Sequence, residues 1–487
     1  MTSISKWSWA YCLILWVGIS GPAHLFSSAQ ASQDLSPAFY VALDGSDTNP
    51  GTLAKPFATF GRAQQAMRAS STIKTTYIRA GTYRPTALAK AACMNGKAGG
   101  ASVDLRTPDN GETWSYYPPD GYDSAILDGQ STVGNSAGAG GNGTGCAFSG
   151  YRISNITIVG LQIKNYLYSA LWVNTGTNLV FLNNVVHHLT AAAWGAGAVS
   201  TTCAPGTLVK NNYMHDLAYT GTELETRSDC PGGISDSVVS GNVIFNSCTW
   251  PAVPGHGNDQ NGGDCGAIYF DDKISPPSSN IEVVNNYVRD VNKASGGAGN
   301  NGHDGKQGCC AIGIYLDDGT SNVTATGNIL AGIMSGCFDI HGGNNDVIQG
   351  NICDLANSVY QTIGVYQQSK LGYEMSGNVF RNNIVVSSSR GAGSGFTAYQ
   401  RPPNPMTIRE NFYFNYAGSS VNNSGVGGAG GEASPKYVDP QLSGWTYDIK
   451  GESPVLNSSA SFPPIVGGWG PPGFTIPHEG TPPSCPH

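Results

Sequence analysis

Charged residues are scarce in this chain. Asp, Glu, Lys and Arg make up only 12% of the 487 residues, half of the usual ~25%. The 25 basic residues are outnumbered by 33 acidic ones, which gives a net charge of −8. This balance argues against nucleic acid as a partner, because phosphates require a basic surface. The sequence also lacks the Ala, Glu, Lys, Leu and Arg heptads of a coiled coil.

Glycine and hydrophobic residues are plentiful by contrast. Glycine accounts for 66 of the 487 residues, well above the average share of ~7%. Hydrophobic residues make up 40% and aromatic residues 10%, enough for a large core, which excludes a disordered tail protein. A chain of this length can still be one domain if it is a β architecture or a repeat array. We expect many short strands joined by Gly and Asn turns.

Long apolar runs are missing beyond the first thirty residues, so no later stretch could span a membrane. At the N-terminus, Lys6 gives a short positive region, residues 7–19 are mostly apolar, and residues 29–31 (Ala-Gln-Ala) form a small-x-small cleavage site. A membrane anchor would need ~20 apolar residues, and Gly21 interrupts the run too early. We expect a signal peptide over residues 1–31 and a secreted or periplasmic protein.

The chain has 12 cysteines, and removal of the signal peptide would leave an odd number. In an oxidising compartment most of them should form disulfides, with one left over. The adjacent Cys309 and Cys310 lack a recurring CxxC and a suitably spaced His, so we predict no structural metal. The pairs suggested by proximity in the sequence are Cys203/Cys230, Cys248/Cys265 and Cys337/Cys353.

A short phrase recurs between residues 180 and 411: an apolar residue, any residue, Gly or Asn, then Asn, then usually an apolar residue. Copies include "FLNNVV", "VVSGNVI", "VVNNYV" and "TATGNIL". The period lies in the twenties, apart from longer intervals that contain insertions, and this indicates a parallel β-solenoid. The anchoring residues are Asn184, Asn212, Asn242, Asn286, Asn328, Asn351, Asn411 and, as alternatives for one coil, Asn378 and Asn383.

The strand pairing and tight turns of a parallel β-solenoid explain this repeated phrase. Each coil makes three short strands, and each strand pairs with its copies in the coils above and below at ~4.8 Å. Such strands bury one face, so apolar residues alternate along them. Asn tolerates the left-handed backbone of a tight turn. Stacked Asn side chains can also hydrogen-bond to one another from coil to coil, so we assign the Asn residues a structural role.

The two ends of the solenoid must be covered. We expect an N-terminal cap over about 38–70, in which Phe57, Phe60, Ala63 and Met67 have the spacing of an amphipathic helix. The remaining boundaries are coils over about 75–420, a closing segment over about 421–460, and a Pro/Gly-rich tail over 461–487 that packs poorly or not at all.

The termini carry a resemblance. The opening "YVALDGSDTNPGT…PFATF…AQQAM", the strand "IRAGTY" and the closing "YVDP…SPVLN" resemble secreted proteins of the pectate-lyase-like superfamily over about residues 38 to 458. The resemblance implies an all-β fold, a single-stranded right-handed parallel β-helix. It implies a carbohydrate-active protein but no single activity, because the superfamily includes lyases, hydrolases, epimerases and non-catalytic proteins.

Alignment of the coils on their Asn residues predicts a polar column about ten residues earlier in each coil. We expect the carboxylates of Asp271 and Asp317 to be stacked one coil apart. We expect Glu225, less firmly Glu223, to lie in the coil before that of Asp271. The expected column holds Asn174, Asp271, Asp317, His341, Gln367 and Gln400. Beside it lie Asp272, Asp318 and Arg401, and on or next to it Tyr269, Tyr315, Tyr366 and Tyr399.

Stacked carboxylates suit acid–base chemistry. Two of them repel, so the pKa of one should rise, which gives the acid and base that glycosidic cleavage needs. Neighbouring coils would suit a retaining enzyme. Glu225 with Asp317, two coils or ~9.6 Å apart, would suit an inverting one, and the sequence does not choose. The "DDG" sequence also fits simple turns or a calcium site.

We predict as catalytic residues Asp271, Asp317, Glu225, Asp318 and Asp272. We predict as substrate-binding residues Asp339, His341, Tyr269, Tyr315, Gln367, Gln400, His256 and His303. The two histidines His256 and His303 lie in long insertions that enter just before the two Asp strands, where loops on a rigid scaffold often carry function.

Three functions remain open. The first is a glycoside hydrolase on a polysaccharide or oligosaccharide, which requires no cofactor and no metal. The second is a lyase or epimerase on uronic acids, which needs the substrate carboxylate neutralised by Ca²⁺ or by Lys or Arg. For it, Asp271, Asp317 and Asp339 are candidate calcium ligands. The candidate cations are Lys273, Arg289, Lys293, Lys306, Arg227 and Arg401. The third is a non-catalytic carbohydrate-binding surface protein. We expect a monomer.

Overall fold

The computed structural model describes residues 37–85, 93, 100–131, 144–191, 195–249, 264–291, 311–355, 365–368, 372–387, 397–400, 404, 406–416, 432–456 and 468–476. Residues 365–368 and 397–400 are described by their backbone alone. The expected signal peptide, Lys293, Lys306, Arg401, His256 and His303 lie outside the described residues.

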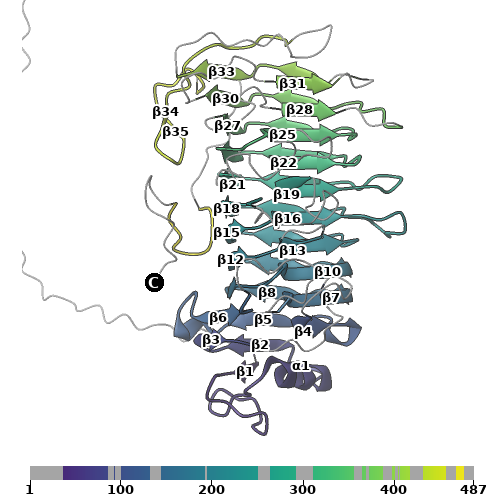
Figure 1. The fold of residues 1–487 in the computed structure, drawn as a ribbon, viewed down its shortest axis with the longest axis vertical. Helices are drawn as coiled ribbons and strands as arrows, with labels where there is room; N and C mark the ends of the chain where they lie inside the picture. The colour runs from purple at the N-terminus through teal and green to yellow at the C-terminus, as the bar shows by residue number, and fades with distance from the viewer. Residues whose placement is uncertain are drawn as a thin grey trace, which may run out of the picture. The chain divides into compact units, whose positions relative to one another are not determined.

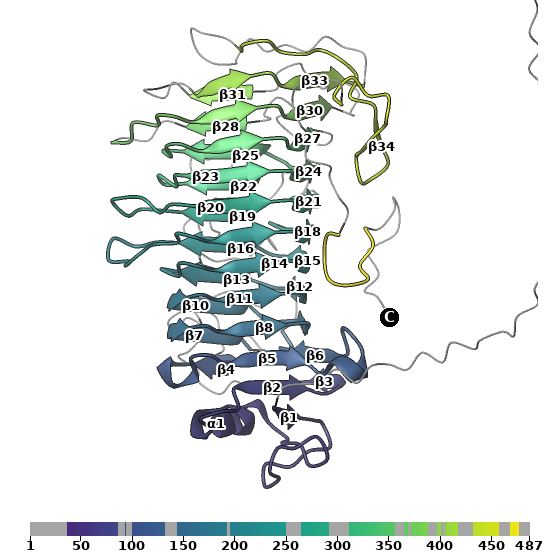
Figure 2. The same ribbon diagram turned by 180° about the vertical axis from the view of Figure 1, so that it is seen from behind.

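Parallel strands make up nearly all regular structure in these residues. Each coil contributes one short strand to each of three sheets, and each strand pairs in parallel with its counterpart in the next coil. Figure 1 shows the coils stacked from β2, next to α1, up to β31 and β33, and Figure 2 shows the same stack from behind. The all-β parallel β-helix predicted from the repeat is confirmed.

The strands within the described residues fall into three long sheets and one hairpin. The twelve-stranded sheet contains, in spatial order, β1 (Phe39–Val41), β2 (Thr75–Ile78), β5 (Thr113–Tyr116), β8 (Thr157–Val159), β11 (Val180–Leu182), β14 (Leu208–Lys210), β17 (Val238–Ser240), β20 (Ile281–Val284), β23 (Val323–Thr326), β26 (Val347–Gln349), β29 (Val379–Arg381) and β32 (Thr407–Arg409). The ten-stranded sheet contains β4 (Ala101–Leu105), β7 (Cys146–Ser154), β10 (Ser169–Thr177), β13 (Gly197–Thr202), β16 (Thr220–Glu225), β19 (Cys265–Asp271), β22 (Ala311–Asp317), β25 (Gly336–His341), β28 (Val365–Gln368) and β31 (Thr397–Gln400). The eleven-stranded sheet contains β3 (Gly81–Tyr83), β6 (Ala125–Asp128), β9 (Gln162–Lys164), β12 (Val185–Leu189), β15 (Tyr213–Leu217), β18 (Val243–Phe245), β21 (Tyr287–Arg289), β24 (Ile329–Ala331), β27 (Ile352–Asp354), β30 (Ile384–Ser387) and β33 (Phe412–Asn415). The hairpin consists of β34 (Leu442–Ser443) and β35 (Asp448–Ile449).

Buried asparagines form a ladder along the stack, as the repeat predicted. The Asn286 side chain, for example, donates to Oδ1 of Asn328 at 2.9 Å and accepts from the Asn242 amide at 3.0 Å. A buried amide is costly unless its donors and acceptors are used, and here both are. The ladder contains Asn184, Asn212, Asn242, Asn286, Asn328, Asn351, Asn383 and Asn411.

Two details of the ladder differ from the prediction. Of Asn378 and Asn383, the two candidates for one coil, Asn383 belongs to the ladder. Asn378 instead forms hydrogen bonds with Gly343 and Asp346 in a different column. The left-handed residue is the one before each ladder asparagine, such as Asn285 with a φ of 54°. Gly or Asn is therefore favoured at that preceding position, although Glu410, with a φ of 59°, occupies it before Asn411. The ladder position itself is selected for its side-chain amide.

Alternating residues of each strand fill the interior and leave the others on the outer face. In β19, Ile268 and Phe270 belong to the central apolar cluster, whereas Tyr269 and Asp271 alternate with them and so face the other way. Burial of such apolar side chains is the main stabilising contribution to the fold. The same alternation carries the polar residues of the ten-stranded sheet to its outer face.

Four disulfides link cysteines of the described residues. All three predicted pairs are present: Cys203–Cys230, Cys248–Cys265 and Cys337–Cys353. A fourth, Cys93–Cys146, was not predicted. Disulfides are typical of oxidising compartments.

The N-terminal end of the stack is covered by helix α1 (Phe60–Ala69), which begins after the N-cap Thr59. The helix buries Phe60, Ala63 and Met67 against the first coils, as its spacing predicted. Phe57 is buried as well but precedes the helix. Among the described residues, no helix is long and apolar enough to cross a membrane.

The C-terminal tail differs from the prediction that it packs poorly. In the described part, residues 468–476, Trp469 and Ile476 are buried in a cluster on the outer face of the eleven-stranded sheet. The rings of Phe474 and Tyr213 lie 4.6 Å apart, and the Gly470 amide donates to the backbone of the coil. Aromatic residues between the prolines and glycines give this segment enough apolar surface to dock.

Candidate active site

The predicted carboxylates lie side by side at the carboxyl ends of consecutive strands. Glu225 at the end of β16 pairs in register with Asp271 at the end of β19, and Asp271 pairs with Asp317 at the end of β22. We call these three residues the carboxylate column. Glu225, rather than Glu223, occupies this register, because Glu223 pairs with Tyr269. The prediction that residues remote in sequence become neighbours here is confirmed.

The column continues in both directions with other polar residues. Thr202 and Asn174 precede Glu225, on β13 and β10. His341 follows Asp317, since the residues before them, Ile340 and Leu316, pair in register. Thr202 was not predicted, although a count of ten residues back from Asn212 reaches it.

One predicted member of the column is wrong by one residue. His341 pairs with Gln368, and Gln368 pairs with Gln400, so Gln400 keeps the predicted register. Gln367 pairs instead with Ile340 and Tyr399. A shift of one residue moves a strand position to the opposite face. The alignment failed here because the sequence "VYQQ" offers two adjacent glutamines and no marker to choose between them.

Asp317 is held by three hydrogen bonds. Its Oδ2 accepts from the Tyr269 hydroxyl at 2.7 Å, and its Oδ1 accepts from the Asp318 amide at 2.7 Å and from Nδ1 of His341 at 2.5 Å. Burial favours neutral His341, but the hydrogen bond and charge of Asp317 outweigh burial and raise the pKa of His341. The cluster thus orients both oxygens of Asp317, which is itself only 3% exposed.

Asp271 has a different environment from Asp317. It is 4% exposed, and burial raises the pKa of its carboxyl to about 7, with the neighbouring charges of Asp317 and Glu225 acting in the same direction. Nζ of Lys273 lies 2.5 Å from Oδ2 and opposes this rise. Oδ1 of Asp271 has no hydrogen-bond partner among the described residues. The two stacked aspartates therefore lie in different environments, Asp317 among three hydrogen-bond donors and Asp271 beside a lysine.

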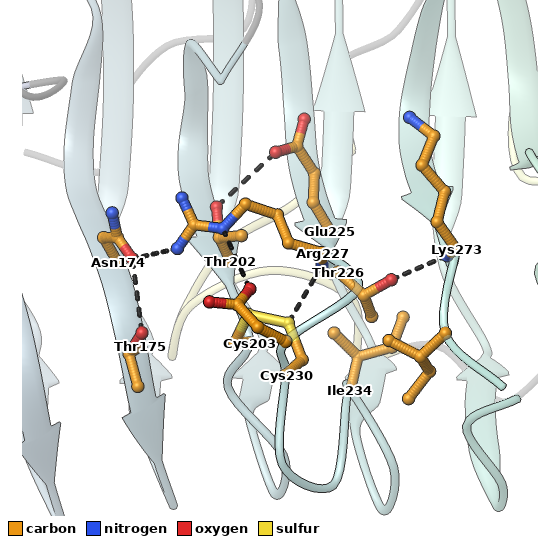
Figure 3. Close-up of a disulfide and its surroundings, with 12 residues drawn as sticks. Asn174, Thr175, Thr202, Cys203, Glu225, Thr226, Arg227, Cys230, Ile234 and Lys273 are labelled. Carbon is orange, nitrogen blue, oxygen red and sulfur yellow. Dashed lines mark hydrogen bonds and ion pairs between the residues drawn. A yellow bond between two sulfur atoms is a disulfide. The ribbon is translucent and has the colours of Figure 1, made fainter. Parts of the chain in front are cut away.

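Two cations border the column on its exposed side. Lys273 bridges Asp271 and, at 3.0 Å, Oδ2 of Asp318, and its side chain is 47% exposed. Arg227 lies two residues after Glu225 and donates to Oδ1 of Asn174 at 2.5 Å. Figure 3 shows the Arg227 guanidinium beside Thr202, below the Glu225 carboxylate. The motif "DDK" was the signal for Lys273, but its contact with both acids was not expected.

The loop that carries Arg227 is anchored by a disulfide. Cys230 in this loop is bonded to Cys203, which directly follows β13 in an earlier coil. The Arg227 amide also donates to the Cys230 sulfur at 2.9 Å. Figure 3 shows the disulfide beneath the guanidinium. The covalent link restricts where Arg227 can reach along the column.

Several predicted site residues lie outside the register of the column and are almost fully buried in this structure. Tyr269, Tyr315 and Asp339 are 0%, 2% and 2% exposed. They form an inner row beneath the column, in which Tyr269 orients Asp317. Asp272, predicted as catalytic, is 1% exposed and accepts from the Ser278 amide at 2.7 Å, so it holds its own loop. Burial of an outward-facing residue depends on segments elsewhere in the chain, which a register argument does not include.

In the part of the chain that the structure describes, the candidate metal ligands form one mixed set of donors. Among the described residues, Asp317, Asp318 and His341 are the one group whose ligand atoms lie within 4.8 Å of one another. Calcium takes about six to eight oxygen ligands, and here one donor is an imidazole nitrogen already bonded to Asp317. The set therefore does not fit calcium. The expected calcium ligands Asp271, Asp317 and Asp339 do not form such a group among these residues.

Comparison with known proteins agrees with the architecture. Residues 146–352 match the family described as right handed beta helix region. The match covers less than half of the chain, and it agrees with the parallel β-helix fold that the strand pairing shows. No curated protein matches this β-helix protein in sequence.

Solved structures similar to this β-helix protein share little sequence with it. One is the GH136 lacto-N-biosidase from Eubacterium ramulus, with 14% identity over 82% of this chain and 67% of that chain, at a TM-score of 0.49. Another is the catalytic domain of a GH87 alpha-1,3-glucanase in complex with nigerose, with 13% identity, 84% and 69% coverage, and a TM-score of 0.47. A third is a rhamnogalacturonan lyase, with 13% identity, 86% and 93% coverage, and a TM-score of 0.43.

Proposed function

We propose that this protein is a secreted polysaccharide-degrading enzyme, a glycoside hydrolase that uses Asp271 and Asp317 as its catalytic pair. The observation that carries this proposal is the register of the carboxylate column, in which the two acids occupy adjacent strands but different environments. Glycosidic cleavage needs one carboxylic acid and one carboxylate on either side of the scissile bond. No cofactor is needed for this reaction.

Asp271 is the general acid in this proposal. With its pKa raised to about 7 by burial, it retains a proton near neutral pH and donates it to the leaving oxygen. Lys273 positions the carboxyl through its 2.5 Å contact. Asp317 is the carboxylate, because it accepts three hydrogen bonds, an arrangement suited to an anion.

The spacing of the pair favours a retaining reaction. Adjacent strands lie ~4.8 Å apart, close to the carboxyl separation of about 5–5.5 Å in retaining enzymes. Asp317 would then attack the sugar and form a covalent intermediate, and Asp271 would next activate water. Glu225 paired with Asp317 is the inverting arrangement. NMR spectroscopy of the anomer that is released first distinguishes the retaining from the inverting mechanism. The Glu225→Gln variant should remain active if the enzyme is retaining.

The second candidate is a lyase or epimerase that acts on uronic acids. It is favoured by Lys273 and Arg227, two half-exposed cations beside the column that could neutralise a substrate carboxylate. A basic group would then abstract the neighbouring proton. Calcium belongs to this alternative only, as a cation for which substrate oxygens would have to supply the ligands that the described residues lack.

One experiment separates these functions. The purified protein is incubated with neutral and uronate-containing polysaccharides, and both new reducing ends and the absorbance of an unsaturated product are followed. Reducing ends without the absorbance support the hydrolase. Both signals together, abolished by EDTA, would replace the hydrolase with a calcium-dependent lyase. Neither signal on a broad panel would favour the non-catalytic carbohydrate-binding protein.

A further inference from the structure

An exposed tyrosine shares the register of the carboxylate column, several coils away. Tyr151 on β7 pairs with Asn174 on β10, which pairs with Thr202 and thus leads to Glu225. The side chain is 38% exposed. From β7 to β19 there are four strand steps, so Tyr151 and Asp271 lie about 19 Å apart along the axis of the stack. This distance is several times the width of a sugar ring.

The interval between Tyr151 and the carboxylates is lined with polar groups. Arg227 reaches back from the end of β16 to Asn174 on β10 at 2.5 Å, past the intervening coil (Figure 3). Glu225 accepts from the Thr202 hydroxyl at 3.5 Å. The Arg227 side chain is 46% exposed. A ligand lying along these strand ends would therefore meet hydrogen-bonding groups in each coil.

Two guanidinium groups accompany Tyr151. The Cζ atoms of Arg106 and Arg152 lie 5.9 and 5.1 Å from the centre of its ring. Arg106 is fixed by an ion pair with Asp104 at 2.9 Å. An aromatic ring packs on the C–H groups of a sugar, and guanidinium donors bond to its oxygens. Tyr151 and the two arginines supply both kinds of contact at one place.

We propose that the strand ends from β7 to β19 bind an extended polysaccharide chain, with Tyr151 as a distal subsite and Arg227 as a contact between it and the carboxylates. The inference rests on the proposed function for its catalytic end. The common register places the residues from Tyr151 to Asp271 in one row along the axis of the stack. Arg227 contacts this row through its hydrogen bond to Asn174. The protein should therefore prefer long chains to short ones, because only a long chain reaches Tyr151.

The test compares Tyr151→Ala with the wild type on a polymer and on its disaccharide or trisaccharide. We expect KM for the polymer to rise about tenfold, the cost of removing one aromatic anchor, with kcat unchanged and no change on the short substrates. Arg227→Gln should weaken polymer binding as well. Tyr151→Phe keeps the aromatic ring, so its KM for the polymer should match that of the wild type. Tyr416→Ala removes an exposed tyrosine (41%) on the side of the eleven-stranded sheet, and it should have no effect on KM.

A second measurement does not depend on turnover: retardation of the protein in gels that contain the same polysaccharides. Tyr151→Ala should migrate faster than the wild type in the gel that retards the wild type. If the wild type is retarded but cleaves no polysaccharide, the proposed function fails and the binding surface stands. If the wild type is active and Tyr151→Ala equals it in KM and in retardation, the distal subsite is wrong and the enzyme stands. Absence of both activity and retardation overturns both.

Discussion

Two stacks of polar side chains run along this solenoid, and they are built on opposite principles. The asparagine ladder repeats one neutral residue that both donates and accepts, so each coil satisfies the next, and its members are 0% exposed. The carboxylate column changes residue from coil to coil and places like charges one strand apart, so it depends on Lys273 and His341 for compensation. Self-complementary repetition stabilises a fold, whereas adjacent carboxylates give acid–base chemistry at a cost in stability.

The largest expected effect is on activity, from the column. Asp271→Asn and Asp317→Asn each keep the shape of the side chain but remove a proton donor or a nucleophile, so we expect about a thousandfold loss of kcat. The thermal transition should stay close to that of the wild type. Reducing-end assays and thermal unfolding measure the two effects. Asp128→Asn, which alters a buried carboxylate in the eleven-stranded sheet, is the control, and activity retained in both column variants would contradict the assignment.

The ladder should respond in the reverse way. Asn286→Ala removes an acceptor for Asn242 and a donor to Asn328 in the buried interior, so we expect a loss of about 2–4 kcal/mol in the free energy of unfolding. Activity per folded molecule should not change. Denaturant unfolding measures the loss. Asn178→Gly, which removes an exposed Asn–Asn bond at a position with a φ of 51°, should change stability by less than about 0.5 kcal/mol. An equal loss in both variants would contradict the role of burial.

The pH dependence of kcat tests whether Asp271 is the acid of the carboxylate column. The raised pKa of Asp271, about 7, means that activity depends on a proton present at lower pH and lost as pH rises through that value. Lys273 lowers this pKa, so Lys273→Met should move the alkaline limb of kcat to higher pH. Lys210→Met, on the exposed face of the twelve-stranded sheet, should leave the limb in place. A limb that moves to lower pH in Lys273→Met would exclude Asp271 as the titrating acid.

The smallest effect is expected beneath the column. Tyr269→Phe removes the 2.7 Å hydrogen bond to Asp317 and little volume, so we expect about a tenfold fall in kcat, the cost of one bond to a charged group. KM should stay the same, because the buried ring does not reach the substrate. Tyr166→Phe removes a buried bond to Ser102 far from the column and should have no effect on kcat. If the two variants have the same kcat, Tyr269 does not act through Asp317.

Sequence reasoning was sufficient wherever one position repeats in every coil. The Asn phrase predicted the ladder and, by counting back, the pairing of Glu225, Asp271 and Asp317. It failed for Gln367, where a doubled glutamine left the register undefined. It also did not predict how deeply Tyr269 and Asp272 are buried, because that burial depends on packing by segments that the repeat does not encode. The role of Lys273 could not be derived, because a lysine after two aspartates can point to solvent as readily as to its neighbours.

The asparagine ladder has a direction. Between asparagine side chains, every amide donates to the Oδ1 of the next coil, from Asn184 onward, while it also donates to a backbone carbonyl of the coil before. The last donor, Asn411, directs its backbone N–H and a side-chain N–H to Oε1 of Glu432 at 3.0 Å. A carboxylate accepts but has no hydrogen to pass on, so Glu432 acts as a terminator of the series. A solenoid lengthened by duplicating coils would have to receive them before Asn411. Coils appended beyond Glu432 would meet an end that cannot propagate.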